Sequence, residues 1–140
     1  MGDLNRVEHI ELNTFPNPWT RRIFYNRYLD EPELFLVACV NGEVVGYIVG
    51  ATEKGGTVGH IMNVAVNEGW KGRGIGTSLL RELEARFIDE NVDLAYLEVR
   101  ISNDRAQKLY RRLGYSKASR IEGYYNDEDA LLMVKDMKKR

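Results

Sequence analysis

Apolar residues within 1–30 recur at the spacing of a helix, with one interruption. Pro16 and Pro18 cannot both lie inside a helix, because proline lacks the backbone N–H and clashes with the preceding turn. The helical pattern resumes over Thr20–Leu29 and reaches Pro32. The pattern therefore predicts two helices separated by a short loop, with the second one ending before Pro32.

Three runs rich in β-branched residues follow, separated by turn residues. Phe35–Val40 and Val44–Ala51 flank Asn41-Gly42, a pair that favours a type I′ hairpin turn because both residues tolerate a positive φ. Lys54–Thr57 contains two glycines and predicts another turn before the run Val58–Val66. The first half of the chain is therefore predicted to form an antiparallel meander of at least three strands.

The second half alternates helical and strand patterns. The predicted elements are a helix over Thr77–Glu90, a strand over Leu94–Ile101, a helix over Asp104–Leu113 and a strand over Ala130–Met137. A right-handed crossover would make the strands at 58–66 and 94–101 parallel neighbours. The pattern thus predicts an α+β fold built on one mixed sheet.

Composition narrows the class of protein. The chain has 140 residues, which suits a single domain over residues 1–140, and 44% of them are hydrophobic, which excludes a disordered chain. Twenty Lys and Arg against 21 Asp and Glu give a net charge of −1, which argues against general nucleic-acid binding, even through the basic tail Lys138–Arg140. The single Cys39 excludes an internal disulfide and a cysteine zinc site.

No apolar run approaches the roughly 20 residues that span a bilayer. The N-terminal residues lack the apolar region of a secretory signal. We therefore expect a cytoplasmic protein without a membrane partner.

A glycine-rich loop lies between the third predicted strand and the helix that follows it. Alternate glycines expose backbone N–H groups, and the helix adds partial positive charge, so the segment predicts a phosphate or pyrophosphate site. It fits neither a Walker A loop nor a dinucleotide fingerprint, which would need a glycine in place of Leu79. The alternative is a flexible loop that caps the helix. The residues are Lys71, Gly72, Arg73, Gly74, Ile75, Gly76 and Thr77.

Glu98 stands on a predicted central strand, where a carboxylate is costly unless it is paired or lines a wet cleft. The two interpretations are a chemical role and an ion pair with Arg100. Asn103 follows the strand and can cap the next helix. Tyr110 lies on the apolar face of that helix, so it is either a core residue or a reacting phenol.

Taken together, these segments resemble the GNAT family of N-acetyltransferases, and within it the protein N-terminal acetyltransferases of the bacterial ribosomal-protein type and their archaeal counterparts. The resemblance implies the GNAT fold, a mixed central sheet with an antiparallel meander and splayed parallel strands, flanked by helices. Two departures are Lys71, where the family usually has Arg or Gln, and a tyrosine motif one residue shorter than is common. The matching segments are His60–Val66, Lys71–Thr77, Leu97–Ala106, Leu109-Tyr110, Leu113–Tyr115, Phe15–Trp19 and Tyr124–Ala130.

The resemblance further implies that acetyl-CoA is the co-substrate and that no metal takes part. Its pyrophosphate would bind the loop at 71–77, its pantetheine arm would pair with Val64, Ala65 and Val66, and Asn103 would bond to that arm. By resemblance Glu98 is the general base, Tyr110 is the general acid at the sulfur, and a backbone N–H near Val64 binds the oxyanion. His60 is the rival base, and its alternative is a structural histidine.

Four residues would wall the peptide entrance by resemblance: Phe15, Pro16, Tyr124 and Tyr125. The implied partners are protein or peptide N-termini, a ribosomal protein among them, and the chain is expected to be a monomer or weak homodimer. The alternatives are an acetyltransferase for a small-molecule amine or a lysine side chain, and a non-catalytic CoA-binding module.

Overall fold

The structure, a computed structural model, describes residues 2–138 and divides them into two compact units. Unit 1 holds the described residues up to Ala51 together with Asn63–Arg86. Unit 2 holds Thr52–Met62 and the described residues from Phe87 onward. Most of the basic tail considered above, residues 139–140, lies outside the described residues. One domain over the whole chain stays a prediction.

Helices and strands follow each other in the predicted order. They are α1 (Gly2–Thr14), α2 (Arg21–Asp30), the 3₁₀ turn η1 (Pro32–Leu34), β1 (Phe35–Val40), β2 (Glu43–Glu53), β3 (Val58–Val66), the 3₁₀ turn η2 (Glu68–Trp70), α3 (Ile75–Asp89), β4 (Leu94–Arg100), α4 (Asp104–Arg112), β5 (Ser116–Tyr125) and β6 (Glu128–Asp136).

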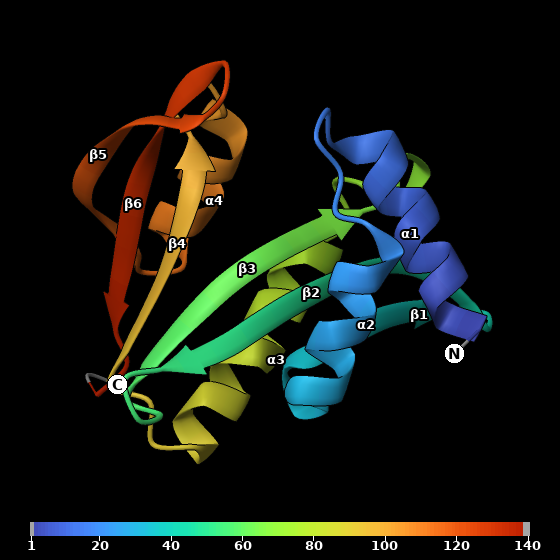
Figure 1. Cartoon of the computed structure of the whole chain (residues 1–140), viewed down its shortest axis with the longest axis horizontal. Helices are drawn as coiled ribbons and strands as arrows, with labels where there is room; N and C mark the ends of the chain where they lie inside the picture. Colours follow the sequence, from blue (N-terminus) through green and yellow to red (C-terminus); the bar gives the residue numbers. More distant parts are fainter. Residues whose placement is uncertain (1, 139–140) are drawn as a thin grey trace. The chain divides into compact units, whose positions relative to one another are not determined.

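One mixed sheet links the strands in the order β1-β2-β3-β4-β6-β5 (Figure 1). The pairs β1/β2, β4/β6 and β5/β6 are antiparallel. The predicted parallel pair is present, with Val58–His60 opposite Leu94–Tyr96. The α+β prediction and the mixed sheet are therefore confirmed.

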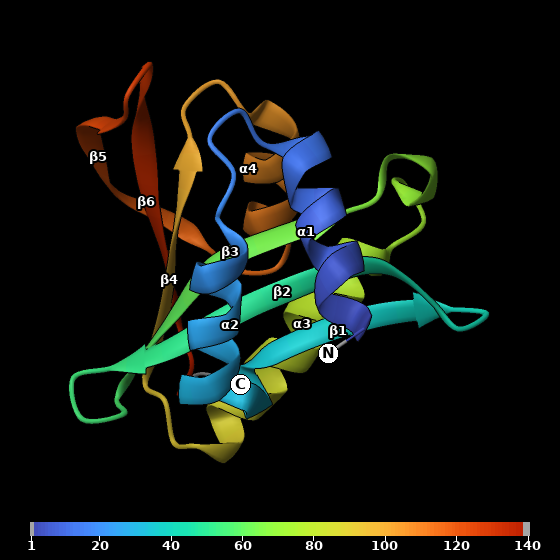
Figure 2. The same cartoon turned by 45° about the vertical axis from the view of Figure 1, so that its right-hand side comes forward.

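In unit 1, helices cover both faces of the β1–β2 hairpin (Figures 1 and 2). On the face opposite α1 and α2, Gly46 lies against α3. A Cβ atom added at Gly46 would lie 3.3 Å from the Ile75 side chain and 3.4 Å from the Leu79 side chain. The core between α1, α2 and the hairpin contains Leu4, Val7, Ile10, Phe24, Val44, Tyr47, Val49 and Ala65.

The hairpin turn has the predicted backbone. Asn41 and Gly42 have φ values of +52° and +79°, as a type I′ turn requires. Thr20 caps α2 by accepting from the N–H of Ile23, which accounts for the helix resuming after the two prolines.

In unit 2, β4 alternates buried and half-buried residues, so Tyr96, Glu98 and Arg100 share one face. Asn103 caps α4, as predicted, by accepting from the N–H of Ala106. Gln107 of α4 donates to the backbone carbonyls of Arg100 and Ile101. These bonds tie the helix to the end of β4.

The structure corrects one assignment and several boundaries. β5 was not predicted, because it is an edge strand whose residues are nearly all exposed and therefore show no apolar alternation. Helix α3 begins at Ile75 rather than 77, inside the glycine-rich segment, and β6 covers Glu128–Asp136 rather than 130–137. The other predicted elements occur within a few residues of their expected limits.

Candidate functional site

Two of the predicted catalytic residues meet in unit 2. A nitrogen of His60, Nε2, lies 2.7 Å from Oε1 of Glu98, and both side chains are only 14% and 13% exposed. His60 belongs to β3 and Glu98 to β4, and the parallel pairing of these strands brings the two side chains together. A buried carboxylate bonded to an imidazole is an arrangement that can accept and pass on a proton.

Tyr96 and Glu53, which the sequence did not single out, complete the surroundings of His60. The Tyr96 ring stacks on the imidazole, with centroids 4.2 Å apart and planes 8° from parallel. Its hydroxyl donates to both oxygens of Glu53 at 2.8 Å. Burial, followed by the bond to Glu53, raises the pKa of Tyr96, so the phenol stays a donor. Glu53 Oε2 also lies 3.5 Å from Nδ1 of His60.

Arg100 does not form the ion pair with Glu98 that the alternative interpretation required. Its Nη1 lies 2.8 Å from Asp127 and 3.0 Å from Glu128, and its guanidinium lies 4.3 Å from the Tyr125 ring centroid. The bond to Arg100 lowers the pKa of both carboxyl groups. Arg100 therefore fixes the β5–β6 turn.

The tyrosine pair of the predicted peptide wall lies at the end of β5, a strand that the sequence did not predict. Tyr124 is 47% exposed, and its ring meets that of Tyr125 edge to face at 5.0 Å. Burial and the neighbouring Tyr124 and Glu98 raise the pKa of Tyr125 to about 12. Both phenols are neutral near pH 7 and offer apolar rings with a polar tip.

Tyr110 is 8% exposed, and burial raises its pKa to about 12. Its ring contacts Tyr115 edge to face. A phenol of this kind keeps its proton at neutral pH and is available to donate it. Asn103 remains exposed while its side chain caps α4.

The glycine-rich loop belongs to unit 1 and opens α3. Gly72 and Gly74 both have φ near +80°, a conformation that side chains rarely adopt. Lys71 pairs with Glu68 at 2.9 Å, and the Arg73 guanidinium lies 4.8 Å from the Trp70 ring centroid. All four residues of 71–74 are exposed. Backbone N–H groups and the cationic side chains of Lys71 and Arg73 therefore lie at the start of α3, which is the arrangement that an anion site requires.

Phe15 and Pro16 lie between α1 and α2, where Phe15 packs against the core of unit 1 and Pro16 is exposed. Glu11, 1% exposed, holds this segment. It accepts hydrogen bonds from the Tyr47 hydroxyl, from Asn63 Nδ2 at 2.8 Å and from the Trp19 N–H at 2.8 Å. The sequence signal was available, since Glu11 stands on the apolar face of α1.

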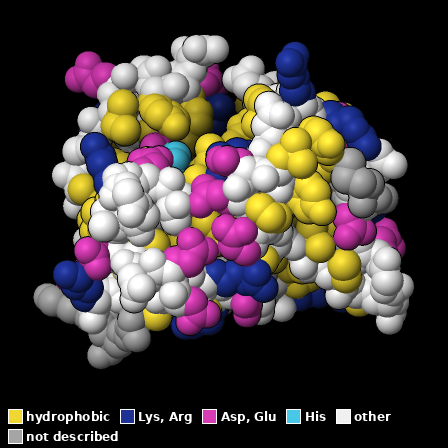
Figure 3. Space-filling view, turned by 60° about the horizontal axis from the view of Figure 1, so that its bottom comes forward, with side chains coloured by type: hydrophobic (Ala, Val, Ile, Leu, Met, Phe, Trp, Pro, Cys, Tyr) yellow, Lys and Arg dark blue, Asp and Glu magenta, His cyan; other side chains and the backbone are white. Residues whose placement is uncertain are grey.

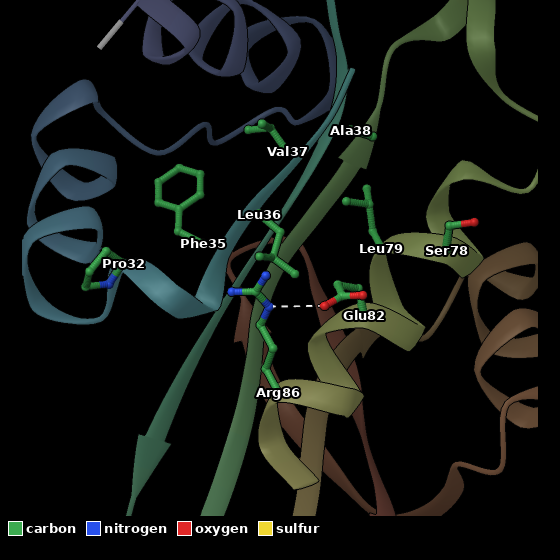
Figure 4. Close-up of a pocket in the computed structure, with 9 residues that line it drawn as sticks. All are labelled: Pro32, Phe35, Leu36, Val37, Ala38, Ser78, Leu79, Glu82 and Arg86. Carbon is green, nitrogen blue, oxygen red and sulfur yellow. Dashed lines mark hydrogen bonds and ion pairs between the residues drawn. The ribbon is translucent and has the colours of Figure 1, made fainter. Parts of the chain in front are cut away.

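A pocket of about 500 Å³ in unit 1 contains none of the predicted site residues. It lies between β1 and α3, and Figure 4 shows Arg86 and Glu82, both from α3, paired on one side of it. Their ion pair, 3.2 Å long, makes this a partly charged surface pocket.

On the face drawn in Figure 3, Lys and Arg side chains stand among Asp and Glu instead of forming a basic patch. Within the described residues, no helix is both long and apolar enough to cross a membrane.

Comparisons with known proteins identify the family. A sequence model of the acetyltransferase (GNAT) family matches residues 4–115. An N-acetyltransferase of Methanocaldococcus jannaschii, named as uncharacterized, is 41% identical over 135 residues, covering 95% of this chain and 85% of that protein. An N-alpha-acetyltransferase of Saccharolobus solfataricus is 34% identical over 149 residues, covering 98% and 89%.

Among solved structures, Ard1 from Thermoplasma volcanium matches with a TM-score of 0.92 at 29% identity, covering 96% of this chain and 91% of that one. The match extends over both units, so fold and sequence agree over nearly the whole length. The chain belongs to the acetyltransferase (GNAT) family.

Proposed function

We propose that the chain transfers the acetyl group of acetyl-CoA to the N-terminal α-amine of proteins or peptides by direct attack on the thioester. The relatives named N-alpha-acetyltransferase support this substrate class. The observation that carries it in the structure is the 2.7 Å contact between His60 and Glu98 on neighbouring parallel strands. Direct transfer needs a proton acceptor for the amine, and this pair can supply one.

The choice of amine follows from its acidity. An α-amine has a reference pKa near 8 and a lysine side chain one near 10.4, so an N-terminus loses its proton far more readily at neutral pH. Glu98 takes this proton, directly or through a water, and His60 is the alternative acceptor. The neutral amine then attacks the thioester carbon and forms a tetrahedral oxyanion, which a backbone N–H near Val64 stabilises.

The leaving thiolate, with a reference pKa of about 8.5, leaves more easily if it is protonated. Tyr110 is assigned this role, which its retained proton supports, and the proton that the attacking nitrogen still has to lose returns to the phenol oxygen. Asn103 and the backbone of Val64–Val66 bind the pantetheine arm.

The phosphates bind the segment at 71–77, which is exposed over 71–74, through backbone N–H groups, Lys71 and Arg73. Phe15, Pro16, Tyr124 and Tyr125 contact the substrate peptide. The preferred first residue, a ribosomal target, a cytoplasmic location and a monomer or weak homodimer remain predictions.

The test uses acetyl-CoA and short peptides that differ in their first two residues. Each peptide is supplied with a free and with a blocked N-terminus, and every peptide carries an internal lysine. Mass spectrometry then locates the acetyl group. Label on free α-amines alone is the expected result. Label on blocked peptides would move the activity to lysine, and no label with intact acetyl-CoA binding would favour a small-molecule amine or a non-catalytic module.

A further inference from the structure

The imidazole of His60 has a carboxylate at each of its two nitrogens. Nε2 lies 2.7 Å from Oε1 of Glu98, and Nδ1 lies 3.5 Å from Oε2 of Glu53. The three side chains come from β3, β4 and β2, and all belong to unit 2. We refer to Glu53, His60 and Glu98 as the proton cluster.

The chemistry of these groups fixes how many protons they hold. An ionised carboxylate only accepts hydrogen bonds, and a neutral imidazole has a single N–H. Glu53 accepts from the Tyr96 hydroxyl at both oxygens, which is the role of an ionised carboxylate. A neutral ring would therefore turn a lone pair toward one of the two anions. A ring protonated at both nitrogens satisfies both, and 2.7 Å is typical of such a charge-assisted bond.

Burial gives the proton cluster a direction. Glu98 and His60 are 13% and 14% exposed, whereas the Glu53 side chain is 40% exposed. A proton on Glu98 is therefore shielded from water, and Glu53 is the member of the proton cluster that is most exposed to water.

Tyrosines surround the proton cluster without adding charge. Tyr96 stacks on His60 and holds Glu53, so it orients both groups. The charge of Glu98 contributes to raising the pKa of Tyr124 and Tyr125 on β5. Burial raises the pKa of all three phenols, and they stay neutral near pH 7.

We propose that Glu53, His60 and Glu98 share one proton in addition to the single N–H of a neutral imidazole, and that Glu53 is the outlet through which a proton leaves to water. The role in turnover rests on the proposed function. In each turnover the substrate ammonium gives one proton to Glu98, and one proton leaves Nδ1 of His60 through Glu53 to water. The remaining ring proton then shifts from Nε2 to Nδ1, so that Nε2 can accept the proton from Glu98 and the starting arrangement returns. The proton count of the cluster is restored, and the neutral amine keeps the electron pair that attacks the thioester.

The first test does not depend on activity. The chain has two histidines, so the ring ¹⁵N signals of His60 are identified by their loss in His60→Gln. In the wild type near pH 7, both ring nitrogens are expected to carry protons. In Glu53→Gln, the ring is expected to lose one. Glu33→Gln, at an exposed glutamate outside the cluster, makes the same charge change and should leave the signals unaltered. A singly protonated ring in the wild type, or identical signals in Glu53→Gln, would overturn the proposal.

The second test separates a proton outlet from a merely structural residue. Glu53→Gln is expected to lower kcat about tenfold with both KM values nearly unchanged, and Glu53→Asp should recover part of the loss. The loss should shrink above about pH 8, where the α-amine is already neutral. A loss that is equal at every pH, or no loss, would contradict the outlet.

The two proposals fail in different ways. If the wild type acetylates no peptide while the NMR result holds, the proposed function is wrong and the shared proton stands. If the wild type acetylates peptides but Glu53→Gln matches it in both tests, the outlet is wrong and the function stands.

Discussion

Two glutamates with little solvent exposure, Glu11 in unit 1 and Glu98 in unit 2, have different kinds of partner. Glu11 in unit 1 is 1% exposed and accepts from Tyr47, Asn63 and the Trp19 backbone. Glu98 in unit 2 is 13% exposed and contacts His60. The partners of Glu11 are neutral donors, whereas the partner of Glu98 is an imidazole, whose ring nitrogens can both accept and donate a proton.

This difference separates a structural carboxylate from a chemical one. Neutral donors stabilise a buried carboxylate but cannot accept a proton from it. Burial raises the pKa of Tyr47, so its hydroxyl also remains a donor. Glu11 therefore fixes the segment that carries Phe15 and Pro16. Glu98, through His60 and Glu53, has a route for protons.

Removing Glu11 is expected to have the largest effect. Glu11→Ala leaves one buried donor, on Tyr47, and two half-buried donors, on Asn63 and Trp19, without their acceptor, which should lower the free energy of unfolding by about 4 kcal/mol. Urea unfolding measures this. Glu8→Ala on the same helix removes only a partly exposed contact with Arg21 and should cost less than about 1 kcal/mol. Equal losses in the two variants would refute the structural role of Glu11.

Glu98→Gln is expected to lower activity and not stability, the reverse of the result expected for Glu11→Ala. Loss of the base should lower kcat about 100-fold, while the free energy of unfolding changes by about 1 kcal/mol or less and acetyl-CoA affinity is kept. Steady-state kinetics and urea unfolding on the same preparation check both parts. Unchanged turnover across the pH range would make Glu98 structural and leave His60 as the base.

The tyrosines beside the two glutamate clusters sharpen the comparison. Tyr47→Phe deletes a buried donor to Glu11 and should cost about 1–2 kcal/mol of stability. Tyr96→Phe keeps the ring on His60 but releases Glu53, so it should lower kcat about threefold with a smaller loss of stability. If both variants lose stability and neither changes kcat, the distinction between the two glutamates is wrong.

The smallest effect concerns acid pH at the β5–β6 turn. Arg100 lowers the pKa of Asp127 and Glu128 in the folded chain, so their stabilisation is complete above the unfolded values near 4 and is lost as the pH falls below them. The N–H of Ser102, which donates to Glu128, reports this in an NMR titration. Its protection from exchange, relative to the intrinsic rate at the same pH, should fall below about pH 4, while the Trp19 N–H stays protected by Glu11. Simultaneous loss of both signals would indicate global unfolding instead.

Local patterns were sufficient for most elements. The Asn41-Gly42 turn, the two prolines and the cap at Asn103 act on neighbouring residues, so their effect is readable from the chain. β5 was missed because an exposed edge strand owes its structure to pairing with β6, not to an apolar alternation of its own.

The sequence by itself determined the α+β order of elements, the glycine-rich loop and the candidate pair Glu98 and Tyr110. Tertiary structure alone decided which partners the carboxylates have. Glu11 and Asn63 lie 52 positions apart, and His60 and Glu98 lie 38 apart, so no local pattern reveals that they touch. The same long-range pairing placed a histidine against Glu98, whose alternative interpretation was an ion pair with Arg100, and added Glu53. A residue's spacing shows which face it occupies, but its charge and proton exchange depend on the groups that folding brings against it.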